Sequence, residues 1–363
     1  MVSDLMHVAL LANTDWLDHE LAQFRRLVIG LFDEQVRVAQ VVPQDLPHQY
    51  YSFFGDRLTW RDTSWARSRR KRLVGLSESL KKLDVDLIHA LDGQLWDASV
   101  RLAQELQVPA VLSASCGADV ARVKRLARHV TSGRIMFTAA TQPIARAIEQ
   151  RLGESSPVDF VPPGVHRASA DDMHQGQGHV LCAVVSGSGL VDSDYEELFG
   201  AMAQLLAEQP QAQFFLEGCG SDQHALWQMA ERFELLANVS FVSSGVGHHE
   251  LLIRADVLIQ PQSLGRARSL TLQAMAHGMT VLAKADPWLD YLIDDQTARL
   301  VGSHDRDQWL QLLRHVVDEP DDMRDLGDRA RQWIGDRHLA SQQIARTLDV
   351  YRRACGESIK FSG

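Results

Sequence analysis

One stretch, residues 258–283 (LIQPQSLGRARSLTLQAMAHGMTVLA), constrains the fold of this chain more than any other. It opens within the run DVLIQP, which is short, apolar and β-branched and therefore predicts a buried strand. After a polar loop, LTLQAMAH repeats its apolar residues at helical spacing as far as Gly278, and TVLA then predicts a second strand. Strand, loop, helix and strand form one parallel crossover unit. Its loop lies at the carboxyl end of a strand, where open α/β sheets bind ligands, and the unpaired amides of the helix start favour a phosphate.

Strands and helices alternate twice along the chain, and this repetition predicts the fold class. We expect an α/β protein with two Rossmann-like, doubly wound parallel-sheet domains that face each other across a cleft. The first domain is assigned to residues 1–165 and the second to residues 166–340, with the polar residues 166–178 as the linker. The aromatic residues 43–64 are interpreted as an elaborated loop, whose role the sequence leaves open.

Composition and charge exclude several classes of protein. The 363 residues are 45% hydrophobic and 23% charged, as in soluble globular proteins, and no apolar run approaches the roughly 20 residues that span a bilayer. The first residues lack the features of a signal peptide, so we expect a cytoplasmic protein. The net charge of −10, concentrated after residue 165, argues against nucleic-acid binding. Four scattered cysteines without a C-x-x-C pair predict buried free thiols.

The first half offers one candidate for acid–base chemistry. His89 and Asp92 end a predicted strand on the side expected to face the cleft, and a histidine beside a carboxylate can act as a general base. The alternative is a strand-end histidine satisfied by local hydrogen bonds. His, Cys and Asp at the spacing of metal ligands are missing, so we expect neither a metal nor another cofactor. A nucleophile elbow, a P-loop and a G-x-G-x-x-G fingerprint are also missing.

Several segments of the second half follow one another in a specific order. They are FVPPGV, FFLEGCGSDQHALWQMAERFELLANVSFVSSGV, HHELLIRADVLIQPQS, LQAMAHGMTVLA and DDQTARLVGSHDRDQWLQLLRHVVDEPDDMRDLGDRARQW, which together cover most of residues 158–335. This order resembles that of the family 4 (group 1) GT-B-fold retaining glycosyltransferases. The resemblance implies a nucleotide-sugar donor of the UDP, GDP or ADP type bound by the second domain and an acceptor bound by the first. It also implies that the last helix, within residues 341–363, packs back on the first domain.

The chain departs from the family pattern at the charged positions of the donor site. The family has two glutamates eight residues apart (E-x7-E), where this chain has Gly265 and Gln273. It has an arginine and a lysine five residues apart, where this chain has Ser188 and Ser193, and a frequent histidine before glycine, where this chain has Cys116. Loss of one donor to a developing negative charge typically costs about 100- to 1000-fold in rate. Either other residues replace these groups, or the chain is a catalytically inactive homologue that acts as a binding or partner subunit.

Candidate replacements lie in two loops. Arg266 and Arg268 stand beside the predicted helix start, where two guanidinium groups can fork onto phosphate oxygens; the alternative is two solvated loop arginines. Ser269 is expected to cap that helix or to bind the same ligand. The glycine loop SGSGL can approach a diphosphate with its backbone amides, or serve only as a tight turn. The full set of predicted donor-binding residues is Ser186, Gly187, Ser188, Gly189, Gly265, Arg266, Arg268, Ser269, Leu270 and Gln273.

One basic cluster suggests a membrane surface. It consists of Arg67, Arg69, Arg70, Lys71 and Arg72, with Trp60 and Trp65 nearby. Mixed basic and aromatic residues dock on anionic lipid surfaces, and members of the resembling family use lipid-linked or polysaccharide acceptors. The cluster is therefore interpreted in two ways, as a solvated helix start or as a peripheral contact with the inner membrane surface.

Overall fold

The computed structural model describes residues 5–44, 46, 54–60, 66–130, 134–153, 158–168, 180–188, 190, 192–217, 223–242, 252, 254–302 and 305–356, without the side chains of residues 66–71, 127–130 and 223. The chain divides into two compact units. The first comprises Met1–Gly164, Gly265–Ala267 and Ala340–Gly363, and the second Val165–Leu264 and Arg268–Leu339. Each unit contains one parallel β-sheet with helices, so the two predicted parallel-sheet α/β domains are confirmed.

The first unit is built on a seven-stranded sheet in the order β3-β2-β1-β4-β5-β6-β7. Its strands are β1 (His7–Leu11), β2 (Arg37–Pro43), β3 (Asp56–Trp60), β4 (Leu87–Ala90), β5 (Ala110–Ala114), β6 (Ile135–Ala139) and β7 (Asp159–Phe160). Its helices are α1 (Thr14–Asp33), α2 (Ala66–Lys82), α3 (Trp96–Leu106), α4 (Val123–Val130), α5 (Gln142–Leu152) and α12 (Ala340–Ala354), with the short 3₁₀ helices Gly93–Leu95 and Gly117–Arg122. Every strand pair is parallel, as the central apolar runs predicted.

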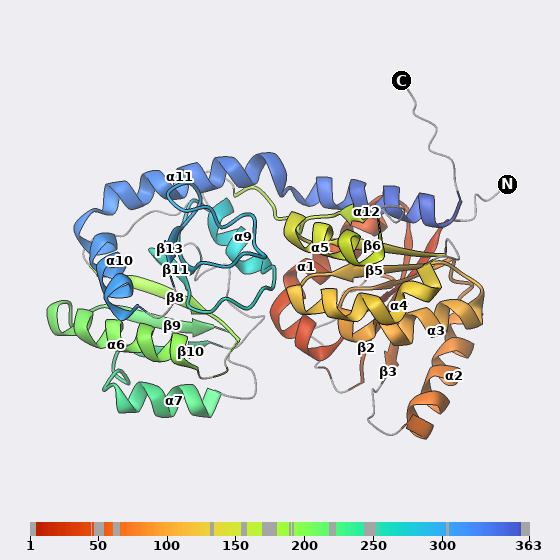
Figure 1. The fold of residues 1–363 in the computed structure, drawn as a ribbon, viewed down its shortest axis with the longest axis horizontal. Coiled ribbons are helices and arrows are strands. Elements are labelled where there is room, and N and C mark those ends of the chain that lie inside the picture. The colour runs from red at the N-terminus through yellow and green to blue at the C-terminus, as the bar shows by residue number, and fades with distance from the viewer. Residues whose placement is uncertain are drawn as a thin grey trace. The chain divides into compact units, whose positions relative to one another are not determined.

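The last helix of the described chain is part of the first unit. In Figure 1 the blue helix α12 lies with the red-to-yellow elements, and it contacts α1, β5 and β6. Ile344, Leu348 and Tyr351 belong to the same buried core as Phe24 and Leu31 of α1. Gly30 makes this packing close, because a Cβ at residue 30 would lie 2.6 Å from the side chain of Ile344.

The interpretation of residues 43–64 as a loop is wrong in one part. Residues 56–60 form β3, which pairs in parallel with β2 at the edge of the sheet, from Ala39 opposite Asp56 to Pro43 opposite Trp60. Gln40 Nε2 also donates a 2.6 Å hydrogen bond to the carbonyl of Phe54. The sequence concealed this strand because only Trp60 in it is buried, so no apolar run marks it.

The second unit is built on a six-stranded parallel sheet in the order β10-β9-β8-β11-β12-β13. Its strands are β8 (Cys182–Ser186), β9 (Gln213–Glu217), β10 (Val239–Val242), β11 (Val257–Gln260), β12 (Thr280–Lys284) and β13 (Arg299–Val301). The helices for which bounds are described are α6 (Ser193–Glu208), α7 (Gln223–Arg232), α9 (Ser269–Ala276), α10 (Arg306–Asp318) and α11 (Pro320–Arg337). The stretch that opened the sequence analysis is therefore β11, a loop, α9 and β12, in the predicted order.

Two glycines bring α11 against the end of α9. Gly278 follows α9 with a φ of 78°, a conformation that glycine adopts without strain. A Cβ at Gly327 of α11 would lie 2.0 Å from the carbonyl oxygen of Gly278, so the helix can approach only without a side chain there. This contact holds the carboxyl end of α9 against α11.

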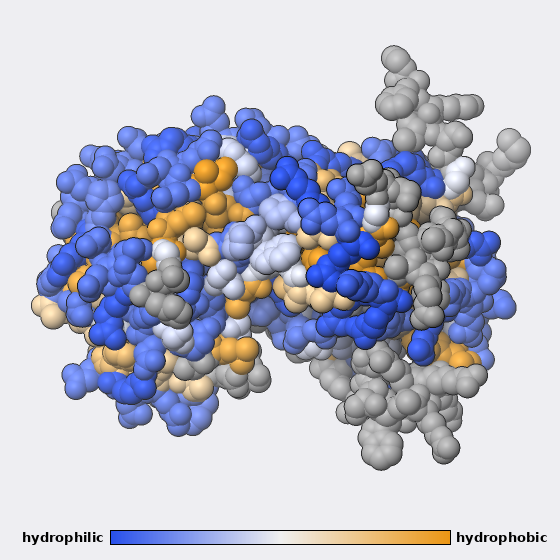
Figure 2. All heavy atoms as spheres, in the orientation of Figure 1, coloured by the Kyte–Doolittle hydropathy of each residue, from blue (hydrophilic) through white to orange (hydrophobic). Residues whose placement is uncertain are grey.

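The surface adds three observations. Hydrophilic residues dominate the face drawn in Figure 2, and hydrophobic residues appear there in separate areas. In the described part of the chain, no helix combines the length and apolarity needed to cross a bilayer. Cys116 is buried, but Cys182 is only partly buried and Cys355 is exposed, so the expectation of buried thiols is wrong for Cys355; Cys219 lies outside the described residues.

Replacing Gly327 with alanine is expected to destabilise the second unit by about 1–3 kcal/mol, because the added methyl group overpacks the contact between α11 and Gly278. Gly75→Ala in α2 is the matched control, since no atom lies within 4 Å of its Cβ position. That change is expected to leave stability equal or raise it by about 0.5–1 kcal/mol. Urea unfolding of both variants measures the difference, and equal midpoints would contradict the described packing.

Candidate functional site

The strand order of the second unit defines where a ligand is expected. Successive strands run outward from β8 in one direction and from β11 in the other, so the order reverses between these neighbours. Open α/β sheets bind ligands beyond the carboxyl ends of the strands at such a reversal. Here those ends are Ser186 of β8 and Gln260 of β11, and the matching reversal in the first unit lies between β1 and β4.

The glycine loop after β8 is held by a side chain that follows β11. Gln262 Oε1 accepts hydrogen bonds from the Ser188 amide at 2.8 Å and from the Ser188 hydroxyl at 2.9 Å. Its Nε2 donates to the Leu190 carbonyl at 3.2 Å and to Asp192 Oδ2 at 2.5 Å. The Ser188 amide, predicted as a phosphate donor, is therefore already hydrogen-bonded within the protein. Glycine is required at residue 187 for packing, because a Cβ there would lie 2.1 Å from the Tyr195 hydroxyl. Gly189 lies outside the described residues.

Arg268 is an interior residue rather than a solvated loop arginine. It is 3% exposed, and its Nη2 lies 3.5 Å from Glu217 Oε2 and 3.3 Å from the Ser186 hydroxyl, to which it donates. Ser186 in turn donates to Glu217 at 3.0 Å. The ion pair joins the ends of β8 and β9 to the start of α9. A buried guanidinium needs such a carboxylate to offset its desolvation, so its charge is already compensated.

The start of α9 also differs from the prediction. The N-cap is Arg268, with no side-chain cap, so the expectation that Ser269 caps the helix is wrong. The Arg268 amide donates to the Tyr291 hydroxyl at 3.1 Å. Ser269 and Leu270 are buried inside the unit, and Gln273 is half-buried on α9. The packing of this end of the helix therefore leaves the amides of its first turn as the groups to consider for a ligand, rather than the Leu270 side chain.

Lys284 is a cation at this edge of the sheet that the sequence analysis missed. It ends β12, yet its ammonium group contacts Asp194 in the first turn of α6, the helix that follows β8. Because β11 lies between β8 and β12, the side chain reaches across the carboxyl end of β11. Both residues are only 13% exposed. A lysine ending a buried strand was the available signal.

Arg266 belongs to the first unit and Arg268 to the second, so the expected pairing of the two on one phosphate stays a prediction. Residue 266 forms an antiparallel bridge with Cys116, flanked by hydrogen bonds from the Gly117 amide to Gly265 and from the Ala267 amide to Ser115, at 2.8 and 2.9 Å. Gly265 has a φ of 61°. An acidic residue in this conformation would be strained by about 1–2 kcal/mol.

Asp119 is a buried carboxyl group at the same edge of the first unit. Its Oδ2 accepts hydrogen bonds from the amides of Ser115 and Cys116 at 3.2 and 3.1 Å. Burial, reinforced by the negative charge of Asp92, raises its pKa to about 6, against the opposing effect of those amides and of Arg266. Burial likewise raises the pKa of the Cys116 thiol. The sequence analysis did not identify Asp119 as a candidate acid or base, because Asp119 lies in a turn with no neighbouring histidine.

The prediction that His89 acts as a general base beside the Asp92 carboxylate is wrong. His89 Nδ1 is hydrogen-bonded to the Tyr351 hydroxyl at 2.6 Å, and Nε2 to the Ser113 hydroxyl at 2.7 Å. Burial lowers its pKa to about 3, which makes His89 too weak a base to take a proton efficiently near pH 7. Asp92 instead accepts from the Gln94 amide at 2.7 Å and from Asn13 Nδ2 at 3.2 Å. The alternative interpretation, a strand-end histidine with local partners, describes His89 better.

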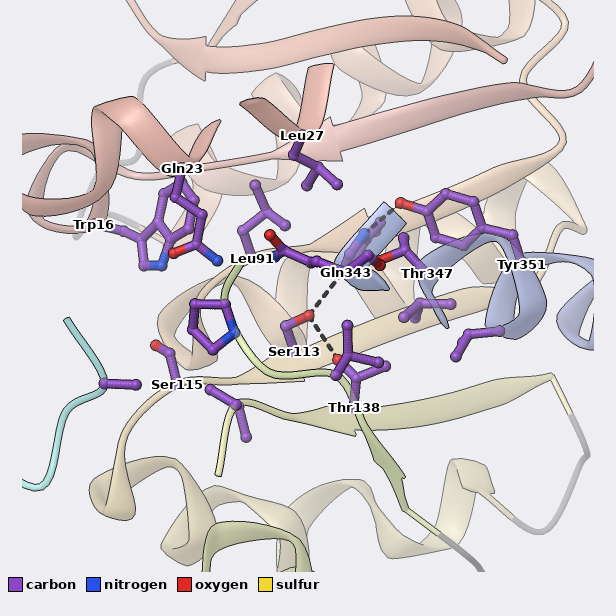
Figure 3. A pocket seen from close by; sticks show the side chains of 18 residues that line it. Trp16, Gln23, Leu27, Leu91, Ser113, Ser115, Thr138, Gln343, Thr347 and Tyr351 are labelled. Carbon is purple, nitrogen blue, oxygen red and sulfur yellow. Dashed lines mark hydrogen bonds between the residues drawn. The ribbon is translucent and has the colours of Figure 1, made fainter. Parts of the chain in front are cut away.

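A small cavity lies beside His89 and is enclosed by α1, α12 and the ends of β4, β5 and β6 (Figure 3). The Ser113 hydroxyl is hydrogen-bonded to His89 and also to Thr138, and Figure 3 shows its bond to Thr138. Its volume is about 40 Å³, which holds a few water molecules. Pockets for organic ligands are typically about 300–1000 Å³, so this cavity is not an acceptor site.

A metal centre has no support in the described part of the chain, where no three His, Cys, Asp or Glu residues come together as ligands. His248 and His249, which are adjacent in the sequence, lie outside it, as do Gly218 and Gly220.

Known structures with the same architecture identify the fold. Sucrose-phosphate synthase from Thermosynechococcus elongatus matches with a TM-score of 0.75 and 17% identity over 97% of this chain and 100% of that one. Anabaena HepE in complex with UDP and glucose matches with a TM-score of 0.74 and 14% identity over 95% and 100%. The fold is that of the GT-B glycosyltransferases.

Sequence comparison finds one family model that matches part of the chain. A model described as "Glycosyl transferases group 1" matches residues 184–333, from β8 to α11. The MMP alpha-(1->4)-mannosyltransferase of Mycolicibacterium hassiacum is 31% identical over 125 residues, which are 33% of this chain and span only 30% of that protein. Residues 184–333 therefore resemble the group 1 glycosyltransferases, as the segment order predicted.

Replacing Arg268 with methionine is expected to destabilise the second unit by about 3–5 kcal/mol, because Glu217 is left buried without its charge partner. Arg268→Met combined with Glu217→Leu is expected to cost less than either single change. Denaturant unfolding of the three variants measures the coupling. A stable Arg268→Met protein with weakened nucleotide binding would instead support the phosphate role predicted from the sequence.

Asp119 is expected to make the stability of the first unit depend on pH. Its pKa is higher in the folded chain than its ordinary value, so folding takes up a proton between about pH 4 and 6. The resulting contribution, about 2–3 kcal/mol, is fully present below pH 4 and is lost as the pH rises through about 6. Asp119→Asn should remove this dependence in unfolding measurements across that range. A wild-type profile that is unchanged by the substitution would contradict it.

Proposed function

We propose that this protein is a glycosyltransferase that binds a nucleotide-sugar of the UDP, GDP or ADP type and transfers the sugar to an acceptor with retention. The observation that carries the proposal is the family match over residues 184–333, which includes β8 and β11, the strands at the reversal of the second sheet. The donor nucleotide is assigned to that carboxyl edge. The mannosyltransferase relative and the UDP-glucose complex of HepE support a nucleotide-sugar as the donor class.

The diphosphate of the donor needs a cation, and Lys284 is the candidate in this chain. Arg268 is neutralised inside the unit by Glu217, whereas the Lys284 ammonium group lies at the edge where the sheet reverses, against Asp194. A diphosphate that enters would compete with the Asp194 carboxylate for this ammonium group. Since charge-assisted hydrogen bonds to phosphate are stronger than neutral ones, Lys284 would supply part of the binding free energy that the missing family residues provide elsewhere.

The acceptor is assigned to the first unit. Asp119, Cys116 and Arg266 lie at its carboxyl edge, and a carboxyl group with a pKa near 6 can accept the proton of a hydroxyl acceptor near neutral pH. A lipid-linked or polysaccharide acceptor, with peripheral membrane contact through Arg67–Arg72 at the start of α2, remains part of the proposal. Of that cluster, only the Arg72 side chain is described.

A second candidate is a catalytically inactive homologue that acts as a binding or partner subunit. The observation that favours it is that groups expected to bind the donor already bind other residues of the protein. The Ser188 amide donates to Gln262, and Arg268 pairs with Glu217. In addition, Gly265 stands where the family has an acidic residue. Turnover separates the two candidates. Measured hydrolysis or transfer with a panel of nucleotide-sugars supports the enzyme, and binding without any turnover supports the inactive homologue.

Calorimetry with UDP, GDP and ADP tests the donor site. Lys284→Met is expected to weaken binding of the preferred nucleotide about tenfold or more, because one charge-assisted contact is lost. Asp194→Asn is expected to strengthen binding, because it removes the competing carboxylate and a repulsive charge.

Glu208→Gln serves as the matched control for Asp194→Asn. Glu208 also pairs with a basic residue, Arg314, but on the exposed surface of the same unit. This variant should bind like the wild type. No binding of any of the three nucleotides at millimolar concentration would refute the proposed function, and equal responses of all variants would refute the role of Lys284.

A further inference from the structure

A cavity of the second unit lies away from the carboxyl edge of its sheet, against α11. Its volume is about 490 Å³, within the range of pockets for organic ligands. Residues 165–168, the end of α9 and the last three turns of α11 line it. Figure 1 shows α11 along the outside of this unit, where it packs on α9 and β12. No part of the proposed donor site contributes to the lining.

The guanidinium group of Arg167 lies in this cavity and contacts α11. Arg167 Nη2 donates to the Gly335 carbonyl at 3.4 Å, and a Cβ at residue 335 would lie 3.3 Å from both Nε and Nη2 of Arg167. Glycine inside a helix costs up to about 1 kcal/mol relative to alanine. Gly335 therefore lets the Arg167 guanidinium pack against α11. This contact gives the Arg167 side chain a more fixed position than that of a solvated arginine.

A second guanidinium group, that of Arg329, lies in the same cavity. Its Nη2 donates to the Asp295 carbonyl at 3.2 Å. In the described part of the chain, neither Arg167 nor Arg329 has a carboxylate partner, although Arg331 pairs with Asp328 at 3.6 Å. Each guanidinium has five N–H donors and is held by one carbonyl, so both present charge and donors to an anion.

The remaining lining fits the rest of a ligand. Asp328 and Asp336 place carboxylate oxygens in the cavity, and carboxylates accept hydrogen bonds from hydroxyl groups. Val165, Ile334 and Leu339 supply apolar surface. Three arginines against two aspartates leave the lining positive within a half of the chain that is strongly acidic. Positive charge, hydroxyl acceptors and apolar surface together select a small phosphorylated polyol over an uncharged sugar or an inorganic anion.

We propose that this cavity is a binding site for a small phosphorylated polyol, whose phosphate is held by Arg167 and Arg329 and whose hydroxyl groups are held by Asp328 and Asp336. The site is separate from the proposed donor site. It also adjoins two of the four places where the chain passes from one unit to the other, because Val165 and Leu339 line it and pair in a parallel bridge. A bound ligand would therefore fix the start and the end of the second unit together.

Calorimetry of the full chain with ribose 5-phosphate, inorganic phosphate and ribose tests the site. Ribose 5-phosphate is expected to bind with a Kd of about 1 mM or tighter, inorganic phosphate more weakly, and ribose not at all. Arg167→Ala and Arg329→Ala are each expected to weaken ribose 5-phosphate binding about tenfold or more. Gly335→Ala should weaken it as well, because the methyl group presses on the Arg167 guanidinium.

Two controls make the result specific. Arg324→Ala removes an exposed arginine of the same helix that pairs with Asp321 at 2.8 Å outside the cavity, and Lys284→Met alters the proposed donor site. Both should bind ribose 5-phosphate like the wild type, whatever their effect on nucleotides. The proposal is overturned if ribose 5-phosphate does not bind, if Arg324→Ala weakens it as much as Arg167→Ala does, or if inorganic phosphate binds equally well.

Discussion

The parallel direction of every strand is the constraint on which the rest of the structure depends. Strands that run the same way place all their following loops at one edge, so polar residues distant in the sequence meet there. Ser186, Glu217 and Arg268 meet in this way at the edge of the second sheet, although 82 positions separate the first from the last. The first sheet brings Asp92 toward Asp119 by the same means, which contributes to the raised pKa of Asp119. In both units the chemistry follows from the strand order.

The polar groups of the second edge largely satisfy one another. Gln262 holds the glycine loop, and Glu217 holds Arg268, so two of the groups expected to bind a diphosphate contribute to stability instead. Removing one partner of a buried ion pair leaves the other charge unpaired and lowers the stability of the fold. A substitution of Arg268 or Glu217 alone is therefore strongly destabilising. Lys284 differs because its partner, Asp194, stands in the first turn of a helix rather than in the core. Any donor chemistry in this unit therefore has to use groups that the family pattern does not mark.

The sequence predicted the elements better than the site, and particular residues show why. Periodicity located β11, α9 and β12 because burial imposes it on apolar residues, and it missed β3 because four of its five residues are not buried. The pairings of His89 depend on Tyr351, 262 positions later, which no local pattern contains. Lys284 ends a strand in the sequence and reaches Asp194 only in three dimensions. Family positions could be counted in advance, but the positive φ of Gly265 could not be predicted from them.

The packing of α12 has a consequence for biosynthesis. Residues 340–354 fill one wall of the core whose other parts come from the first 164 residues, with Ile344 against Gly30 and Tyr351 against His89. A ribosome delivers the amino-terminal segment first, and domains usually fold in that order during translation. Here the earliest segment has to wait, with an apolar groove exposed, until the intervening unit has been synthesised. This nascent chain is a candidate for chaperone binding during that interval, and loss of the final helix would harm the half of the protein made first.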